Sequence, residues 1–187
     1  MTLFEYITVA ESLVLSLSIV RMLDGITSAF ESHRRYSVHA AWCAIKMVQP
    51  LLIWWSIWEL HDHRDWNFLA FSLCVASPAI LYLQISILMP DDDESVTDWR
   101  AYFYENKSRF FRANIGLALA GPLLMVALGA VGAALILAGA ASLEIALSIL
   151  ALTSSHERVH VAVVTITALA FAAWPILLFT PEALGSG

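Results

Sequence analysis

The sequence is poor in charged residues and in cysteine. Asp, Glu, Lys and Arg make up only 14% of its 187 residues, whereas about a quarter of the residues in soluble domains are charged. Hydrophobic residues make up 59%. This composition is typical of a membrane protein, and it leaves no room for a large soluble domain beside several membrane spans.

The sequence also lacks an excess of positive charge. Its 10 Lys and Arg residues stand against 16 Asp and Glu residues, which gives a net charge of −6. Binding to nucleic acid needs clustered Lys and Arg that displace counterions, so we expect no nucleic-acid partner. Both cysteines, Cys43 and Cys74, lie within apolar runs, where cysteine behaves as a small buried hydrophobic residue, and we expect no disulfide.

The N-terminus lacks the basic head and the small-residue cleavage site of a signal peptide. We therefore expect the first apolar run to remain in the protein as a helix. A bilayer core needs about 20 apolar residues in helical form, because no water is available there to satisfy the backbone. The apolar runs thus predict an all-α, polytopic membrane bundle of about six transmembrane helices in a single domain over residues 1–187. The predicted spans are 3–29, 38–60, 66–89, 113–134, 137–153 and 158–179.

The boundary between the fourth and fifth spans is the least constrained. The apolar stretch over 113–152 is longer than one bilayer crossing, so we place a turn near Gly139. The alternative is one long helix with a re-entrant piece, which would give five spans.

The segment 95–111 has a different pattern. Trp99, Tyr102, Phe103, Asn106 and Phe110 recur at helical spacing. Ser95 and Asp98 before them form a capping-box-like start. We predict an amphipathic helix on the cytoplasmic surface of the membrane, with a solvated loop as the alternative.

The distribution of basic residues predicts the orientation. The loops after the first, third and fifth predicted spans hold Arg34, Arg35, Arg100, Lys107, Arg109, Arg112 and Arg158, and the opposite side holds only Arg64. Loops rich in Lys and Arg stay in the cytoplasm. We therefore expect both termini to lie outside, with the chain in the plasma (inner) membrane of a bacterium.

The first two spans carry ionisable and polar residues at membrane depth. Such residues are costly there unless they are paired or hydrated, and they often mark function. Glu11, Ser18 and Arg21 share one stripe of the first span, and Asp24 follows. The second span carries Lys46 and Gln49. At a rise of about 1.5 Å per residue, Asp24 lies at the depth of both cations, so Asp24 with Lys46, or with Arg21, are the expected pairs.

Glu11 stands apart from these charges. It lies about 15 Å further out along the helix than Arg21, and no cation is within reach in the sequence. Burial disfavours a charged carboxylate, so we expect Glu11 to be protonated at neutral pH or to face water. This makes Glu11 the main candidate for a proton or cation site. The alternative is structural, because paired charges also hold helices or subunits together without transport.

The segment 156–160 reads H-E-R-V-H, which matches the H-E-x-x-H pattern. It resembles the motif of intramembrane zinc metalloproteases. That resemblance implies zinc bound by His156 and His160, with Glu157 as the general base. The Asp24-Gly25 pair resembles the element that supplies a third ligand in site-2 proteases. Here, however, that element precedes the histidines instead of following them.

These observations favour a small channel or transporter without a cofactor. Protons or small cations would pass along the polar faces of the first two spans. Glu11 would bind the ion, Lys46 and Arg21 would set the local field, and Asp24 would pair with them. We expect a homo-oligomer in the lipid bilayer, because six short helices enclose little space. The alternatives are the zinc protease and a non-catalytic membrane subunit of a larger complex.

Overall fold

The computed structural model describes residues 2–29, 35–92 and 95–179, together with their side chains except at 26–29 and 174–179. Within this part the chain is helical throughout and contains no strand, which confirms the predicted all-α class. The helices are α1 (Leu3–Ala29), α2 (Ser37–Trp58), α3 (Phe68–Leu88), α4 (Trp99–Ala127), α5 (Val131–Thr153) and α6 (Glu157–Phe179).

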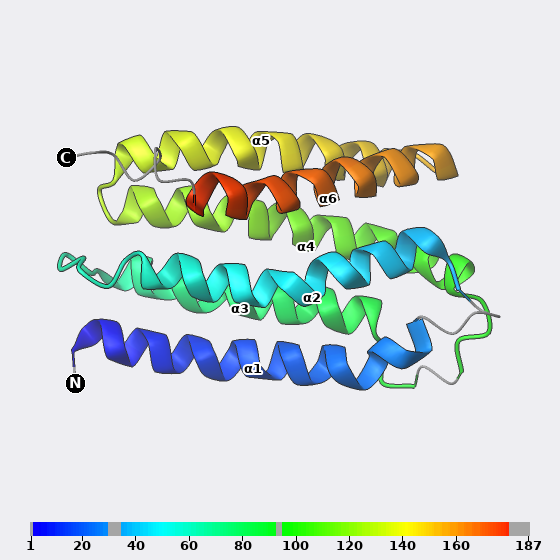
Figure 1. The fold of residues 1–187 in the computed structure, drawn as a ribbon, viewed down its shortest axis with the longest axis horizontal. Helices are drawn as coiled ribbons and strands as arrows, with labels where there is room; N and C mark the ends of the chain where they lie inside the picture. The colour runs from blue at the N-terminus through cyan, green and yellow to red at the C-terminus, as the bar shows by residue number, and fades with distance from the viewer. Residues whose placement is uncertain (1, 30–34, 93–94, 180–187) are drawn as a thin grey trace.

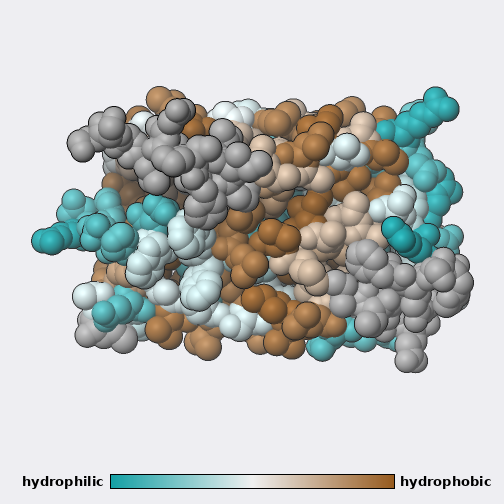
Figure 2. Space-filling view, viewed as in Figure 1, coloured by the Kyte–Doolittle hydropathy of each residue, from teal (hydrophilic) through white to brown (hydrophobic). Residues whose placement is uncertain are grey.

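Five helices, α1 to α5, are long and apolar enough to cross a membrane. Figure 2 shows a hydrophobic band around the middle of the molecule, with hydrophilic side chains gathered at both ends. This distribution is the one that a bilayer core between two aqueous phases favours. The fold is therefore consistent with an integral membrane protein.

The helices run nearly parallel to the long axis of the molecule, and consecutive helices are antiparallel (Figure 1). Contacts link α1 to α3, α3 to α4 and α4 to α5, so these four helices form one layer. The other two helices, α2 and α6, contact each other and lie over that layer (Figure 1). The interior lies between the two layers, and α2 to α6 all have a face toward it.

The surface of α1 shows how the bundle sorts its side chains. Leu13 and Leu17 are 66% and 58% exposed, whereas Glu11 and Ser18 are fully buried. In water this arrangement would be unfavourable, but in a bilayer the leucines contact lipid and the polar groups contact protein. At both positions the polar stripe predicted for this helix therefore faces protein and not lipid, since α1 packs against α2 and α3.

The predicted turn near Gly139 is wrong. The chain turns at residues 128–130, between α4 and α5, and Gly139 lies inside α5. Gly129 has a φ of 76°, a left-handed conformation that glycine adopts without a steric penalty. The Ala130 N–H donates to the Met125 carbonyl at 2.9 Å and closes the end of α4. The predicted boundaries 113–134 and 137–153 are shifted accordingly.

The predicted amphipathic helix does not form a separate element. From Trp99 the chain enters α4 and continues without a break to Ala127. Asp98 caps this helix, with Oδ1 accepting from the Arg100 N–H at 2.8 Å. Trp99 and Phe103 are 0% and 2% exposed, because they pack into the hydrophobic core of the protein. The aromatic face predicted to contact lipid thus contacts the bundle instead.

Candidate functional site

Lys46 is a buried cation in the middle of α2. Its side chain is only 1% exposed. The ammonium donates to Gln49 Oε1 at 2.7 Å and to Asn114 Oδ1 at 2.9 Å. Its Nζ also lies 5.8 Å from the ring centroid of Trp42 and 5.5 Å from that of Phe110. Two amide oxygens and two aromatic rings therefore surround the charge, and rings of this kind attract cations.

Asn114 on α4 connects Lys46 on α2 to α3 and α5. Its Oδ1 accepts from Lys46 and also from Gln84 Nε2, the latter at 2.8 Å. Its Nδ2 donates to Glu144 Oε1 at 2.5 Å and to Ser148 Oγ at 3.1 Å. An asparagine amide offers two donors and two acceptor positions, so this side chain is fully used. The protonated Lys46 is a donor only, which fixes the amide oxygen toward Lys46 and the amino group toward the carboxylate.

Glu144 on α5 supplies the negative charge. One carboxylate oxygen accepts from Asn114, and the other accepts from Thr167 Oγ1 on α6 at 3.4 Å. The side chain is half-buried, unlike Lys46 and Asn114. The Lys46 ammonium and the Glu144 carboxylate are thus joined through the Asn114 amide. In the part of the chain that the structure describes, they do not form a direct ion pair.

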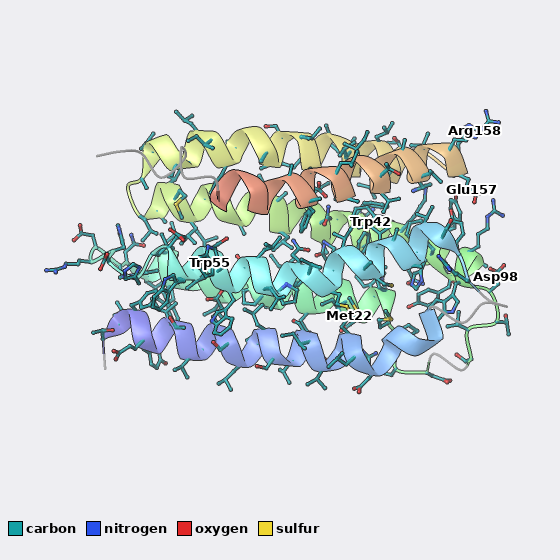
Figure 3. All side chains as sticks on the ribbon, in the orientation of Figure 1. Met22, Trp42, Trp55, Asp98, Glu157 and Arg158 are labelled. Atoms are coloured by element: carbon teal, nitrogen blue, oxygen red, sulfur yellow. The ribbon has the colours of Figure 1, made fainter. Side chains whose placement is uncertain are left out.

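We call this group the central polar cluster. It consists of Lys46, Gln49, Gln84, Asn114, Glu144, Ser148 and Thr167. Figure 3 places Trp42, whose ring faces Lys46, in the interior of the bundle, whereas Asp98, Glu157 and Arg158 lie at one end. Sequence reasoning identified Lys46 and Gln49 but missed Asn114 and Glu144. A signal was present, since Glu144 is the only charged residue between positions 113 and 156.

Glu11 lies outside the central polar cluster. Its side chain is 0% exposed, and neither carboxyl oxygen has a hydrogen-bond partner among the described residues. Cys74 on α3 is likewise buried, in an apolar cluster that includes Ile7 of α1. Ser18, further along the same stripe, is also buried, and its Oγ donates to the Val14 carbonyl of its own helix at 3.2 Å. The hydrogen bonds of the described residues therefore do not join Glu11 and Lys46 into one path.

Arg21 and Asp24 do not contribute to the cluster. Arg21 Nη1 lies 2.5 Å from Asp91 Oδ1, and Nη2 donates to the Met89 carbonyl at 2.6 Å. Arg21 thus binds a free carbonyl at the C-terminal end of α3, where the helix dipole favours a cation. Asp24 is exposed, and the expected pairs with Lys46 and Arg21 are not found in the described part of the chain.

The H-E-x-x-H segment has other contacts. His160 is buried, and its Nε2 lies 3.1 Å from the Ser154 carbonyl. Glu157 Oε2 lies 3.1 Å from Arg100 Nη2, and His156 is exposed. Asp24 is on α1, which packs against α2 and α3. In the described ranges, no three His, Cys, Asp or Glu side chains lie close enough to hold a metal ion, so the predicted ligand set for zinc is not assembled.

A shallow surface groove of about 30 Å³ lies between α1 and α2 and is lined by Ile19, Met22, Leu23, Met47 and Pro50, most of which are exposed. This is room for about one water molecule, and the lining offers it few polar partners.

Comparison with protein-family models, curated proteins and solved structures finds no match to this chain. The buried polar groups and their geometry are therefore the remaining indication of function.

Proposed function

We propose that this chain is a membrane transport protein for protons or small monovalent cations. Lys46, Asn114 and Glu144 form its central site. The observation that supports this most strongly is the connection between a buried ammonium and a carboxylate through a single amide, inside a bundle of apolar helices. Ionisable groups at this depth are costly, and ion pathways and proton relays are among the features that they mark.

Glu144 is the group that would receive the ion. Its second carboxylate oxygen has only the long 3.4 Å contact with Thr167, and the side chain is half-buried. A proton or cation at that oxygen would neutralise the carboxylate. Lys46 would then be a buried cation without a nearby counter-charge, which is strongly unfavourable. Binding at Glu144 would therefore favour a rearrangement around Lys46.

The burial of the central polar cluster favours a carrier over an open channel. Lys46, Gln84 and Asn114 are 1%, 0% and 3% exposed, so no continuous water column reaches them. In this proposal the helices part around the central polar cluster and open the site to one side of the membrane at a time. Either a homo-oligomer or the single bundle would satisfy this requirement.

We further propose that α6 is a sixth span, that both termini lie outside and that the chain resides in a bacterial inner membrane. The basic residues that support this orientation include Arg35, Arg100, Lys107, Arg109, Arg112 and Arg158; Arg34 lies outside the described residues. Loops rich in Lys and Arg are retained in the cytoplasm. The exposed tryptophans Trp54, Trp55 and Trp58 near the other end of α2 suit the opposite interface.

Proteoliposomes containing the purified chain test the proposal. An imposed membrane potential should drive proton or cation entry, read by dyes inside the vesicles. Lys46→Met should abolish most of this flux, whereas Arg64→Met, in an exposed loop, should leave it unchanged. Absence of flux with folded, inserted wild-type protein would refute transport and would favour the alternative, a non-catalytic subunit held together by the same polar contacts.

A further inference from the structure

We propose that Glu11 is a second proton-binding site, occupied by a proton at neutral pH and separate from the central polar cluster. The protonation follows from the surroundings of Glu11 alone. We also propose that Glu11 exchanges protons with the aqueous phase at the end of the bundle where α1 begins. This role in transport rests on the proposed function.

The first argument is the absence of stabilising contacts. Glu11 is 0% exposed, and both carboxyl oxygens lack a hydrogen-bond partner in the described part of the chain. An ionised carboxylate in such a place has neither water nor a donor, and its transfer from water is very unfavourable. The neutral acid carries no net charge and loses far less. Glu144 differs, because donors reach both of its oxygens.

The second argument comes from the elements packed against α1, which are α2 and α3. The cations of α1 and α2 are engaged elsewhere: Arg21 with Asp91, and Lys46 with Gln49 and Asn114. His39 of α2 is bound to the Leu88 carbonyl and stacks on Trp99. The helix α3 contains no Lys, Arg or His, so it supplies no positive charge to Glu11.

The nearby side chains keep this region apolar. Ile7 lies one turn before Glu11 on the same face of α1, and it belongs to a buried cluster with Ile57, Ala70 and Cys74. Glu11 is about 12 Å along α1 from Leu3, at about 1.5 Å per residue. It therefore lies within the hydrophobic part of the helix, yet nearer to the end where α1 begins. A proton taken up there would leave or arrive by local separation of α1 from α3.

Infrared spectroscopy of the full chain in liposomes tests this inference directly. A neutral carboxylic acid has a carbonyl stretching band that an ionised carboxylate lacks. We expect the wild type to show this band at pH 7 at the high-frequency end, because no hydrogen bond weakens the carbonyl. Glu11→Gln should remove the band, and the matched variant Glu59→Gln, at the exposed end of α2, should retain it. In D₂O the band should shift, since the proton exchanges.

Two controls make each outcome decisive. If Glu11→Gln folds poorly, Glu11→Asp replaces it. This variant retains an acid, so it should keep the band at an altered frequency. A band that is missing in the wild type, or that survives in folded Glu11→Gln, would overturn the proton site whatever the flux. A band lost in Glu11→Gln with unchanged flux would support the site and overturn its role in transport. A wild type with the band but no flux would refute only the proposed function.

Discussion

Asn114 decides whether the charges of the central polar cluster are compensated. Its amide oxygen accepts from Lys46, and its amino group donates to Glu144. Among the described residues, no other side chain forms hydrogen bonds with both Lys46 and Glu144. The cation and the carboxylate share the interior because one small side chain contacts both.

Asn114→Leu should therefore destabilise the folded chain. Leucine has a similar volume, but it removes one hydrogen bond each from Lys46 and Glu144 and leaves Gln84 Nε2 without a partner among the described residues. Unsatisfied buried polar groups cost about 1–3 kcal/mol each. We expect the free energy of unfolding in detergent to fall by about 2–4 kcal/mol. Asn106→Leu is the matched control on α4, since Asn106 donates only to the Tyr102 carbonyl of its own helix. Equal losses in the two variants would contradict the bridging role.

Lys46 and Glu144 should behave as a coupled pair. Each of Lys46→Met and Glu144→Gln alone leaves one buried charge uncompensated, whereas the double variant removes both charges. We expect a coupling energy of about 1–3 kcal/mol in a double-mutant cycle of unfolding free energies. The exposed pair Arg100–Glu157, with side chains 57% and 46% exposed, should give a much smaller coupling energy in the same assay. Additive effects at Lys46 and Glu144 would rule out the coupling.

Residue-level prediction from the sequence was partly successful. Helical periodicity indicated that Glu11 and Ser18 share a face, and both are buried. Periodicity does not indicate how a helix is rotated against distant helices, so the predicted contacts of Asp24 are wrong. Glu144 was missed because it stands alone in an apolar segment, and a single residue has no periodicity.

At the scale of helices, the hydrophobic pattern predicted the existence of each helix better than its ends. Runs of apolar residues located α1 to α3 within a few residues. In the second half, Ala and Gly are so frequent that several glycines could mark the turn, and only the backbone conformation separates them. The change in composition predicted a separate helix over 95–111, yet a helix of 29 residues can extend beyond the bilayer without a break.

Two glycine substitutions test the corrected turn. Gly129→Ala places a Cβ at a φ of 76°, which should cost about 1–2 kcal/mol of unfolding free energy. Gly139→Ala adds a methyl group inside α5 where nothing lies within 4 Å, so it should stabilise the chain by about 0.5–1 kcal/mol. Thermal unfolding in detergent would compare the two. If Gly139→Ala were the less stable of the two variants, the turn would lie at Gly139 and not at Gly129.

At the scale of the whole molecule, the hydrophobic band and the two hydrophilic ends require a fixed placement in the bilayer (Figure 2). The class of the fold was predictable from composition because charge is so costly in lipid. The layered arrangement of α2 and α6 over the other helices was not, since it depends on side chains far apart in the sequence.

Cysteine labelling tests the proposed orientation. Cys43 and Cys74 are both 0% exposed, so they should give little background. A membrane-impermeant maleimide added to intact cells should label Glu59→Cys, in the loop after α2. It should label Ser155→Cys, in the loop after α5, only after the cells are permeabilised. The reverse pattern would invert the orientation, and labelling of both in intact cells would contradict the predicted spans.

The most direct test of the central claim is the flux of Glu144→Gln in proteoliposomes, measured against Glu105→Gln. Both variants remove one carboxylate. Glu105, however, is exposed on α4, and no hydrogen bond or ion pair among the described residues joins it to the central polar cluster. With equal amounts of folded protein, we predict at least a tenfold loss of flux for Glu144→Gln, equivalent to about 1.4 kcal/mol, and wild-type flux for Glu105→Gln. Wild-type flux in Glu144→Gln would contradict the claim that the ion binds at the Lys46–Asn114–Glu144 site.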